Sequence, residues 1–293
     1  MKKQSQNQSQ NQLSKQLRIS FIGGGNMATA LIGGLVGKLT DAANIWVVDP
    51  NPEALHKLAQ QFGVHTAPQI AQIDAEVAAC DVVLLAVKPQ QMKQVAAQLL
   101  PPLAAQAQPP LVLSIAAGIR GADLSRWLNG HQAIVRCMPN TPALIGQGIT
   151  GMVAMAGVSP AQRAAADAIM RAVGATVWLD DEALIDPVTA VSGSGPAYVF
   201  YFIEAMQQAA QDMGLSAEQG TQLALATFVG ASQLAAQSGE PVALLRERVT
   251  SKGGTTYAAL TSMEQSGVKA AIVKAMQAAA ARGKELGEEL GRD

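Results

Sequence analysis

The chain has 293 residues, enough for two domains with a full core, and 49% of them are hydrophobic while only 4% are aromatic. A formal net charge of −1 without a long basic run argues against nucleic-acid and membrane-surface binding. No apolar run reaches the roughly 18 residues of a membrane span, and no signal peptide is visible, so we expect a cytoplasmic protein. Cys80 and Cys137 lie in apolar contexts, and we expect both to be core residues.

Residues 1–16 form a tail rich in Gln, Asn and Ser, which we expect to be disordered and to have no part in the fold. From residue 17 onward, short apolar runs alternate with helix-length segments. Strands are expected at 17–22, 45–49, 81–87, 111–115, 133–138, 149–155 and 175–179. Helices are expected at 26–38, 51–61, 89–99, 121–128 and 160–173. This alternation predicts an α/β dinucleotide-binding domain over 17–180, with a parallel sheet covered on both faces.

After residue 180 the strand pattern stops and the spacing of apolar residues becomes helical. Long helices are expected at 196–213, 216–237 and 267–290, and shorter ones at 241–248 and 255–265. We predict an all-α domain over 181–293. Alanine-rich helical domains often bury their faces against a second copy, so we expect a homodimer.

The first expected strand runs into a glycine-rich turn that opens a helix. Its sequence, I-G-G-G-N-M-A, fits G-x-G-x-x-A at Gly23, Gly25 and Ala28. The first glycine permits the tight turn, the second lets the backbone approach a pyrophosphate, and the exposed amides of the helix start hold the phosphates. The position directly after a strand favours this function over a turn without ligand. The expected cofactor-binding residues of this turn are Ile22, Gly23, Gly24, Gly25, Asn26 and Met27.

Asp49 ends the second expected strand, about where an acid would bond the adenosine ribose hydroxyls. A carboxylate there repels a 2′-phosphate and by itself favours NADH over NADPH. A turn aspartate without such a role is almost equally consistent with V-D-P-N-P-E. We place Asp49 and Asn51 of this turn with the cofactor-binding residues.

Three further loops follow expected strands, and ligands of open parallel sheets bind beyond the carboxyl ends of strands. The loop after the expected strand at 133–138 contains two prolines that stiffen it, so it could wall the nicotinamide. Ordinary turns are the alternative, although the common placement of the three loops disfavours it. The expected cofactor-binding residues of these loops are Ala86, Val87, Lys88, Pro89, Ala116, Ala117, Gly118, Met138 and Asn140.

The helical domain supplies no obvious base of the kind that an alcohol dehydrogenase uses to take the hydroxyl proton. The histidines, at 56, 65 and 131, all lie in the first half of the chain, in contexts typical of surface turns. No lysine occurs between Lys93 and Lys252, and no cluster of His, Cys, Asp and Glu has metal-ligand spacing. We therefore expect no metal.

Two stretches of small and hydroxyl residues precede helices in this domain, at Ser192–Pro196 and Ser251–Thr256. Both offer hydroxyls and exposed N–H groups at a helix start, which suits a carboxylate. Helix capping is the usual role of such residues and would suffice for one stretch. Two stretches in a domain that accompanies a nucleotide-binding domain favour a site for a small anion.

The run V-T-S-K-G-G-T-T-Y-A-A-L-T-S-M-E at 249–264 resembles the signature of the Δ1-pyrroline-5-carboxylate reductases. I-G-G-G-N-M-A, A-V-K-P, S-I-A-A-G, M-P-N-T-P-A and V-S-G-S-G-P-A-Y-V-F match that family in the same order, so the resemblance covers residues 17 to about 290. It implies reduction of a cyclic imine to L-proline with NADPH or NADH, the last step of proline biosynthesis. It also implies an N-terminal Rossmann domain and a helical domain that dimerises, in some members within rings of dimers.

The resemblance further implies where the small-molecule substrate binds. Its carboxylate is expected against Ser251, Gly253, Gly254 and Thr255, and its imine nitrogen near the hydroxyl of Thr256, the expected catalytic residue. The residues expected beside that pocket are Ser192, Gly193, Ser194, Gly195 and Pro196.

Two residues depart from the family pattern. Lys252 stands where many members have proline, and Asp49 where many have a small hydroxyl residue, which puts the usual NADPH preference in question. The lack of acid–base residues agrees with the implied reaction, because a protonated imine is already electrophilic and mainly needs positioning.

Two alternatives remain. A β-hydroxyacid dehydrogenase would share the glycine turn, but it needs a catalytic lysine after the linker, which the gap from Lys93 to Lys252 disfavours. A nucleotide sensor without activity is disfavoured by the hydroxyl-rich loops.

Overall fold

The computed structural model describes residues 17–105 and 108–292. The prediction of a disordered tail at 1–16 lies outside the described residues. The described chain forms two compact units. Unit 1 extends to Gly193 and includes the segment from Ala279 onward, while unit 2 comprises Ser194–Ala278. The boundary expected between residues 180 and 181 stays a prediction.

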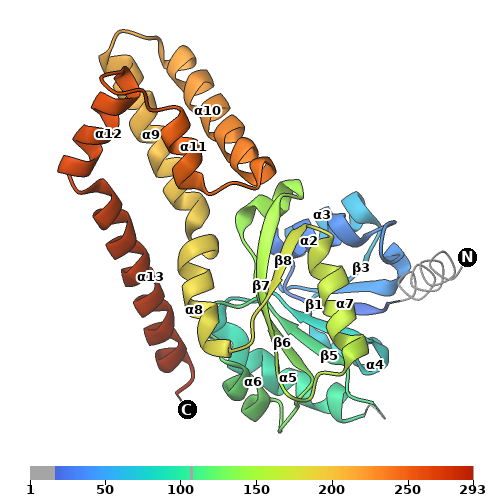
Figure 1. Ribbon diagram of the computed structural model, residues 1–293. Helices are drawn as coiled ribbons and strands as arrows, with labels where there is room; N and C mark the ends of the chain where they lie inside the picture. Colours follow the sequence, from blue (N-terminus) through green and yellow to red (C-terminus); the bar gives the residue numbers. More distant parts are fainter. Residues whose placement is uncertain (1–16, 106–107, 293) are drawn as a thin grey trace, which may run out of the picture. The chain divides into compact units, whose positions relative to one another are not determined.

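Unit 1 is built on an eight-stranded sheet of order β3-β2-β1-β4-β5-β6-β7-β8 (Figure 1). Its first six positions have the strand order of a doubly wound dinucleotide-binding fold. The strands are β1 (Ile19–Ile22), β2 (Ile45–Val48), β3 (His65–Ala67), β4 (Val82–Leu85), β5 (Leu111–Ser114), β6 (Ile134–Met138), β7 (Gly148–Ala154) and β8 (Gly174–Trp178). The predicted α/β fold of this part is thereby confirmed.

Two features of the sheet differ from the expectation. The pair β6–β7 is antiparallel, whereas all other neighbours are parallel. Only the short turn η4 (Thr141–Ile145) joins β6 to β7, and so short a connection cannot cross over to form a parallel pair. The edge strand β3 was not predicted. It is three residues long, and the ring of its His65 stacks on Trp46 of β2 with centroids 4.4 Å apart.

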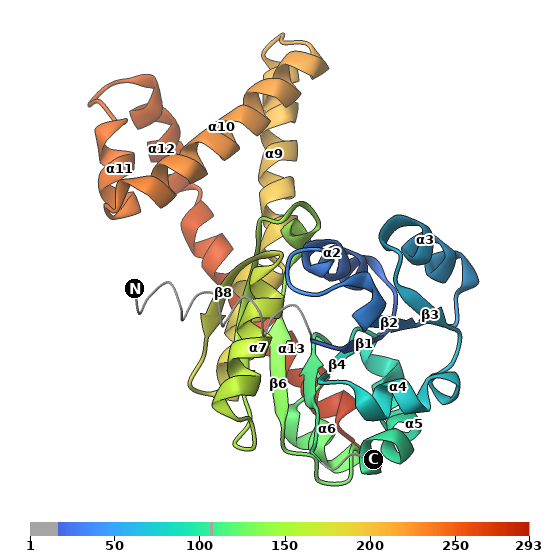
Figure 2. The same ribbon diagram turned by 90° about the vertical axis from the view of Figure 1, so that its right-hand side faces the viewer.

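Helices cover both faces of the sheet, as the continuous apolar strands predict (Figures 1 and 2). One face packs against α2 (Asn26–Leu35), α3 (Pro52–Phe62) and α7 (Pro160–Arg171). The other packs against α4 (Asp74–Ala79), α5 (Met92–Ala104) and α6 (Gly121–Trp127). Cys80 and Cys137 are buried, as expected, and burial raises the pKa of the Cys80 thiol to about 11.

Short helical segments complete unit 1. They are η1 (Ala42–Asn44), η2 (Ile70–Gln72), η3 (Pro89–Gln91), η5 (Glu182–Leu184), α8 (Ile185–Val188) and the π-helical turn η6 (Thr189–Gly193). The end of α13 (Val268–Leu290) also belongs to this unit. There Arg126 Nη2 donates to the oxygen of Gly291 at 2.7 Å. A Cβ on Gly118 would lie 3.2 Å from the Cβ of Leu286, so α13 packs closely over the turn after β5.

Unit 2 is all-α and contains α9 (Gly195–Asp212), α10 (Ala217–Ser238), α11 (Val242–Arg248), α12 (Thr255–Gln265) and the first part of α13. A capping box between Ser216 and Gln219 starts α10, and Gly239 in the left-handed conformation ends it. The apolar side chains buried in the described residues of unit 2 are Ile203, Ala210 and Ala224. None of the described helices is long and apolar enough to cross a membrane.

Candidate active site

The parallel register brings the expected nucleotide-binding loops to one edge of the sheet. Ile22, the last residue of β1, pairs with Val48 of β2 and with Leu85 of β4, and Leu85 pairs with Ser114 of β5. The loops that follow these four residues therefore start side by side. From β1 to β3 successive strands are added on one side of β1, and from β4 onward they are added on the other side. This edge therefore contains the topological switch point, where such folds bind ligands.

The glycine turn has the backbone geometry that a close phosphate contact needs. Gly23 has φ +106°, and its N–H donates to the oxygen of Val48 at 2.8 Å. A Cβ at Gly23 would lie 2.6 Å from the main-chain oxygen of Ala86, so only glycine fits there. Gly25 precedes the first turn of α2, is exposed, and would meet no atom within 4 Å if it had a Cβ. The expected contact residues Asn26 and Met27 form that first turn.

Asp49 is tied to the glycine turn through its side chain. One carboxylate oxygen accepts from the N–H of Gly24 at 2.7 Å and the other from the N–H of Asn51 at 2.8 Å. Asn51 in turn caps α3, since its Oδ1 accepts from the N–H of Glu53 at 3.0 Å. The expected residues of the first two loops thus form one hydrogen-bonded unit with a fixed negative charge.

A groove of about 560 Å³ opens at the carboxyl ends of β1, β2 and β4. Ile22 and Val87, both expected as cofactor contacts, line it together with Val48 and Pro50. Its far wall was not predicted and consists of Pro68, Gln69, Ile70, Ala71, Asp74, Gln91, Gln94, Val95, Gln98 and Pro101. Apolar walls with amide side chains suit a planar base, and the glutamines at 91, 94 and 98 of η3 and α5 were the available sequence signal.

The remaining loops of this edge lie in different settings. Ala86, Val87, Lys88 and Pro89 lead from β4 into η3, and Lys88 is exposed. Ala116 and Ala117 follow β5, whereas Gly118 lies against the end of α13 and lines a separate cavity of about 520 Å³. Met138 ends β6, and the side chain of Asn140 bonds within unit 1 rather than facing open space.

The first hydroxyl-rich stretch straddles the end of unit 1. Ser192 Oγ donates to the oxygen of Val188 at 3.0 Å, and Gly193 lies close to Met138. Ser194 occupies the N-cap position of α9, yet its side chain makes no capping hydrogen bond. Gly195 and Pro196 form the first turn of that helix.

The second stretch is free of capping bonds. Gly254, not a hydroxyl residue, is the N-cap of α12, and Gly253 before it has φ +75°. Within the part of the chain that the structure describes, the hydroxyls of Ser251, Thr255 and Thr256 make no hydrogen bond. Thr256 is half-buried and Thr255 is exposed. These hydroxyls remain available to a ligand.

No described histidine joins these loops. His56 is exposed, His65 stacks on Trp46, and a ring nitrogen of His131 lies 3.0 Å from the oxygen of Pro110. Burial lowers the pKa of His131, which is half-buried rather than in a surface turn as its sequence context indicated. Among the described residues no group of His, Cys, Asp and Glu could hold a metal ion.

An ion pair that the sequence analysis missed supports the sheet beside the site. Arg136, only 5% exposed in β6, has its Nη1 2.6 Å from Glu182 Oε1, which also accepts from the N–H of Gly121 at 2.6 Å. The pair ties β6 to η5 and to the start of α6. The charged Arg136 inside the apolar run A-I-V-R-C-M was the sequence feature that could have indicated a buried ion pair.

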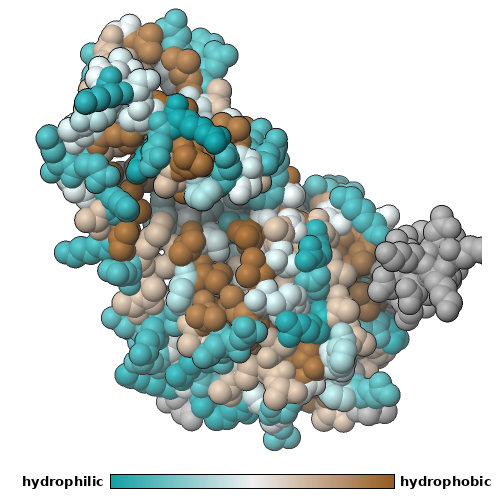
Figure 3. All heavy atoms as spheres, viewed as in Figure 1, coloured by the Kyte–Doolittle hydropathy of each residue, from teal (hydrophilic) through white to brown (hydrophobic). Residues whose placement is uncertain are grey.

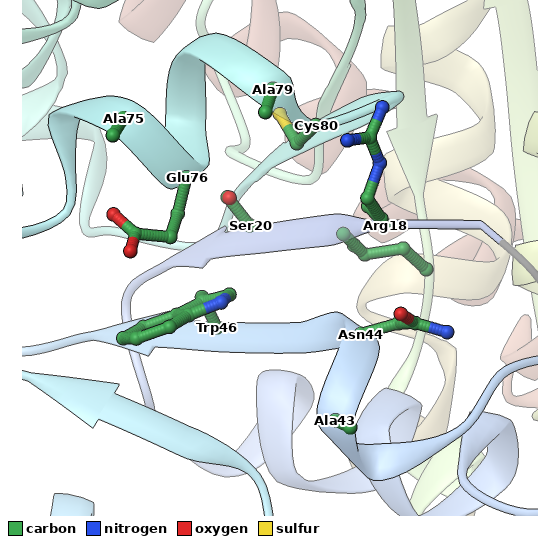
Figure 4. Close-up of a pocket in the computed structure, with 10 residues that line it drawn as sticks. Arg18, Ser20, Ala43, Asn44, Trp46, Ala75, Glu76, Ala79 and Cys80 are labelled. Carbon is green, nitrogen blue, oxygen red and sulfur yellow. The ribbon is translucent and has the colours of Figure 1, made fainter.

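A further hollow of about 260 Å³ lies at the opposite, amino-terminal ends of the strands. Figure 4 shows Ser20 and Trp46 of the sheet beside Glu76 of α4 and Cys80, which directly follows that helix, with Arg18 at the rim. Since the glycine turn follows the carboxyl end of β1, this hollow lies at the edge of the sheet opposite to the expected nucleotide-binding loops.

Comparison with protein families agrees with this arrangement. The model described as pyrroline-5-carboxylate reductase dimerisation matches residues 182–286, and that of the NADP oxidoreductases dependent on coenzyme F420 matches residues 18–118. The pyrroline-5-carboxylate reductase of Pseudomonas aeruginosa is 48% identical over 94% of this chain and 98% of its own length. That of Escherichia coli is 39% identical over 88% of this chain and 94% of its own.

Solved structures lead to the same family. The pyrroline-5-carboxylate reductase of Coxiella burnetii superimposes with a TM-score of 0.85 at 39% identity, covering 92% of this chain and 98% of that one. The pyrroline carboxylate reductase of Plasmodium falciparum, solved with NADP bound, gives 0.81 at 28% identity and covers 93% of this chain and 99% of its own. On the strength of these relatives and of its glycine turn and hydroxyl loop, the chain belongs to the pyrroline-5-carboxylate reductase family.

Proposed function

We propose that the chain reduces Δ1-pyrroline-5-carboxylate to L-proline, with a nicotinamide nucleotide at the carboxyl edge of the sheet and the substrate at the start of α12. The observation that carries the residue assignment is that the hydroxyls of Ser251, Thr255 and Thr256 serve no capping role among the described residues. In this proposal the Thr256 hydroxyl hydrogen-bonds the imine nitrogen, while the amides after Gly253 and Gly254 hold the carboxylate.

The residues at the glycine turn fit a dinucleotide. The cradle at Gly23 leaves no room for a side chain, and the open space at Gly25 lies over the free amides that begin α2. The bound nicotinamide supplies the hydride. The chain's own contribution is to orient the two rings, exclude water and hold the substrate charge. A protonated imine accepts hydride at its ring carbon without a strong acid, which accords with a loop before α12 that offers hydroxyls and main-chain amides, and Lys252 as its one titratable side chain.

For the choice of cofactor, we propose that Asp49 shifts the balance towards NADH. Its carboxylate is held by two main-chain amides and cannot easily turn away from a 2′-phosphate. The negative charge of Asp49 would repel a 2′-phosphate bound beside it, and this repulsion would lower the affinity for NADPH.

Self-association follows from the helical unit and its match to a dimerisation family. Large apolar side chains of α9 and α10 are exposed, including Phe200 at 60%, Tyr201 at 72% and Leu234 at 60%. Figure 3 shows hydrophobic residues, in brown, at the surface of the helical part of the chain. We propose that residues 196–237 form most of the contact with a second copy. We further propose that the chain acts in the cytoplasm. Its net charge of −1 argues against nucleic-acid and membrane-surface partners.

The test is a steady-state assay of nicotinamide oxidation with the cyclic imine and each cofactor. The expected result is imine-dependent oxidation of NADH and NADPH, with no NADP reduction by 3-hydroxy acids, the substrates of β-hydroxyacid dehydrogenases. Failure to oxidise either cofactor in the presence of the imine would refute the proposal.

A further inference from the structure

The side chain of Asn140 is bonded at both ends within unit 1. Its Nδ2 donates to the main-chain oxygen of Ser192 at 3.1 Å, and its Oδ1 accepts from the N–H of Ile149 at 2.9 Å. The residue is only 9% exposed. A buried amide bonded in both directions is fixed in one orientation, so Asn140 holds Ser192 in place relative to β7.

The oxygen of Ser192 depends on this bond because of Pro196. In an α-helix the oxygen of residue 192 would accept from the N–H of residue 196, and proline has none. The next amide, that of Ala197, donates instead to the oxygen of Ser194 at 3.0 Å. Asn140 therefore supplies the hydrogen bond that the helix itself cannot make.

The bonded oxygen lies in the π-helical turn η6, a rare conformation that frequently occurs at functional sites. Gly193 of this turn approaches the loop after β6 closely, since a Cβ there would lie 2.6 Å from Cε of Met138. The loop Met138–Asn140 thus holds the turn by one hydrogen bond and by one close contact.

We propose that Asn140 is a positioning residue for the imine substrate, because it fixes the turn that presents Ser192 and Gly193. This inference rests on the proposed function, in which the stretch Ser192–Pro196 borders the substrate. It differs from the cofactor contact expected from the sequence, which stays a prediction, in that it starts from the two hydrogen bonds that the side chain makes within unit 1.

The test compares Asn140→Asp with the wild type. The substitution keeps the acceptor for Ile149 but points a carboxylate at the Ser192 oxygen. We expect kcat/KM for Δ1-pyrroline-5-carboxylate to fall about 5- to 150-fold, mainly through KM, as for a buried carbonyl left unpaired. The Kd for NADPH, measured by fluorescence titration, should change less than about twofold. Asn44→Asp adds the same charge at the amino end of β2, where the Asn44 side chain makes no hydrogen bond to described residues, and should leave both quantities unchanged.

A pH series gives a readout that a loss of stability would not. A protonated carboxyl at this position can donate to the Ser192 oxygen again, so the ratio of variant to wild-type kcat/KM should rise as the pH falls. Asn140→Ser, which removes the bond without adding charge, is made alongside in case the acidic variant does not fold, and it should show the same KM effect without the pH dependence.

Thr256→Ala separates this inference from the proposed function, because it removes a hydroxyl of the proposed substrate site and leaves both hydrogen bonds of Asn140 in place. If this variant keeps the wild-type kcat/KM for the imine, the proposed substrate site is wrong. If it lowers that kcat/KM while Asn140→Asp does not, the positioning role is wrong. A weaker Kd for NADPH with unchanged imine kinetics in Asn140→Asp would return the residue to the cofactor and overturn the inference.

Discussion

Replacing Gly25 by alanine should weaken cofactor binding while leaving the fold intact. Gly25 has φ −72° and ψ −174°, which any residue adopts, and an added Cβ would meet no protein atom within 4 Å. Alanine is a poorer N-cap than glycine by at most about 1 kcal/mol, which corresponds to a melting temperature lower by about 2–4 °C. The methyl group would instead occupy the space over the first amides of α2, where the pyrophosphate is proposed to bind.

The cost to binding follows from the hydrogen bonds lost. One bond between an amide and a charged phosphate is worth about 1.5–3 kcal/mol, so losing one should raise the Kd for NADH and NADPH about 10- to 150-fold. Fluorescence titration gives the Kd, and thermal unfolding gives the stability.

Two glycines serve as controls for this change. Gly37 has φ +74° and open space around it, so Gly37→Ala should lower the stability by about 1–2 kcal/mol without affecting the Kd. Gly23→Ala places its Cβ against the Ala86 main chain and should damage both. Wild-type affinity of Gly25→Ala for both cofactors would refute the assignment of the phosphates to this helix start.

Three further predictions concern the cofactor, the substrate and the assembly. Asp49→Ser should raise the ratio of kcat/KM with NADPH to kcat/KM with NADH roughly tenfold. It should also lower the melting temperature, because two main-chain amides lose their acceptor. An unchanged ratio would show that Asp49 does not face the 2′-position. Thr256→Ala should lower kcat/KM for the imine about 10- to 150-fold at constant cofactor Kd, while Thr256→Ser keeps most activity; a loss below about threefold would leave the hydroxyl without a role in the reaction. Val229→Glu combined with Leu234→Glu, at side chains 56% and 60% exposed on α10, should shift sedimentation from dimer to monomer, and an unaltered dimer would place the contact elsewhere.

Most of the fold followed from the pattern of apolar runs, and the two departures within the sheet have local causes. The strand at 65–67 was missed because H-T-A is short and polar and gains its place through the stacking of His65 on Trp46. The orientation of β7 was missed because its apolar run looks the same in either direction, and only the short connection η4 decides it. The predicted helices of the second half all occur, within a few residues of their expected ends.

Some features of the candidate site could also be predicted from the sequence, and others could not. The gathering of the expected nucleotide-binding loops at one edge of the sheet could be predicted, because parallel register brings the strand ends together whatever the side chains of the loops are. The family, and the choice of imine reduction over β-hydroxyacid chemistry, followed from the hydroxyl-rich run at 249–264 and are confirmed by the relatives. The hydrogen bonds of Asn140 and Arg136 could not be predicted, because their partners Ser192 and Glu182 are 52 and 46 residues away in sequence.

The helical unit connects assembly to chemistry. Its described residues bury little apolar surface, and no residue of α11 or α12 is buried. A helix without a buried residue has little to hold its first turn in place, since most helical stability in proteins comes from packing. The start of α12, where Thr256 and the glycines before it stand, therefore needs a surface that one copy of the unit does not provide. We expect dimer formation and substrate binding to fail together, so the glutamate variants on α10 should lose imine turnover while the glycine turn in unit 1 keeps its affinity for the nucleotide.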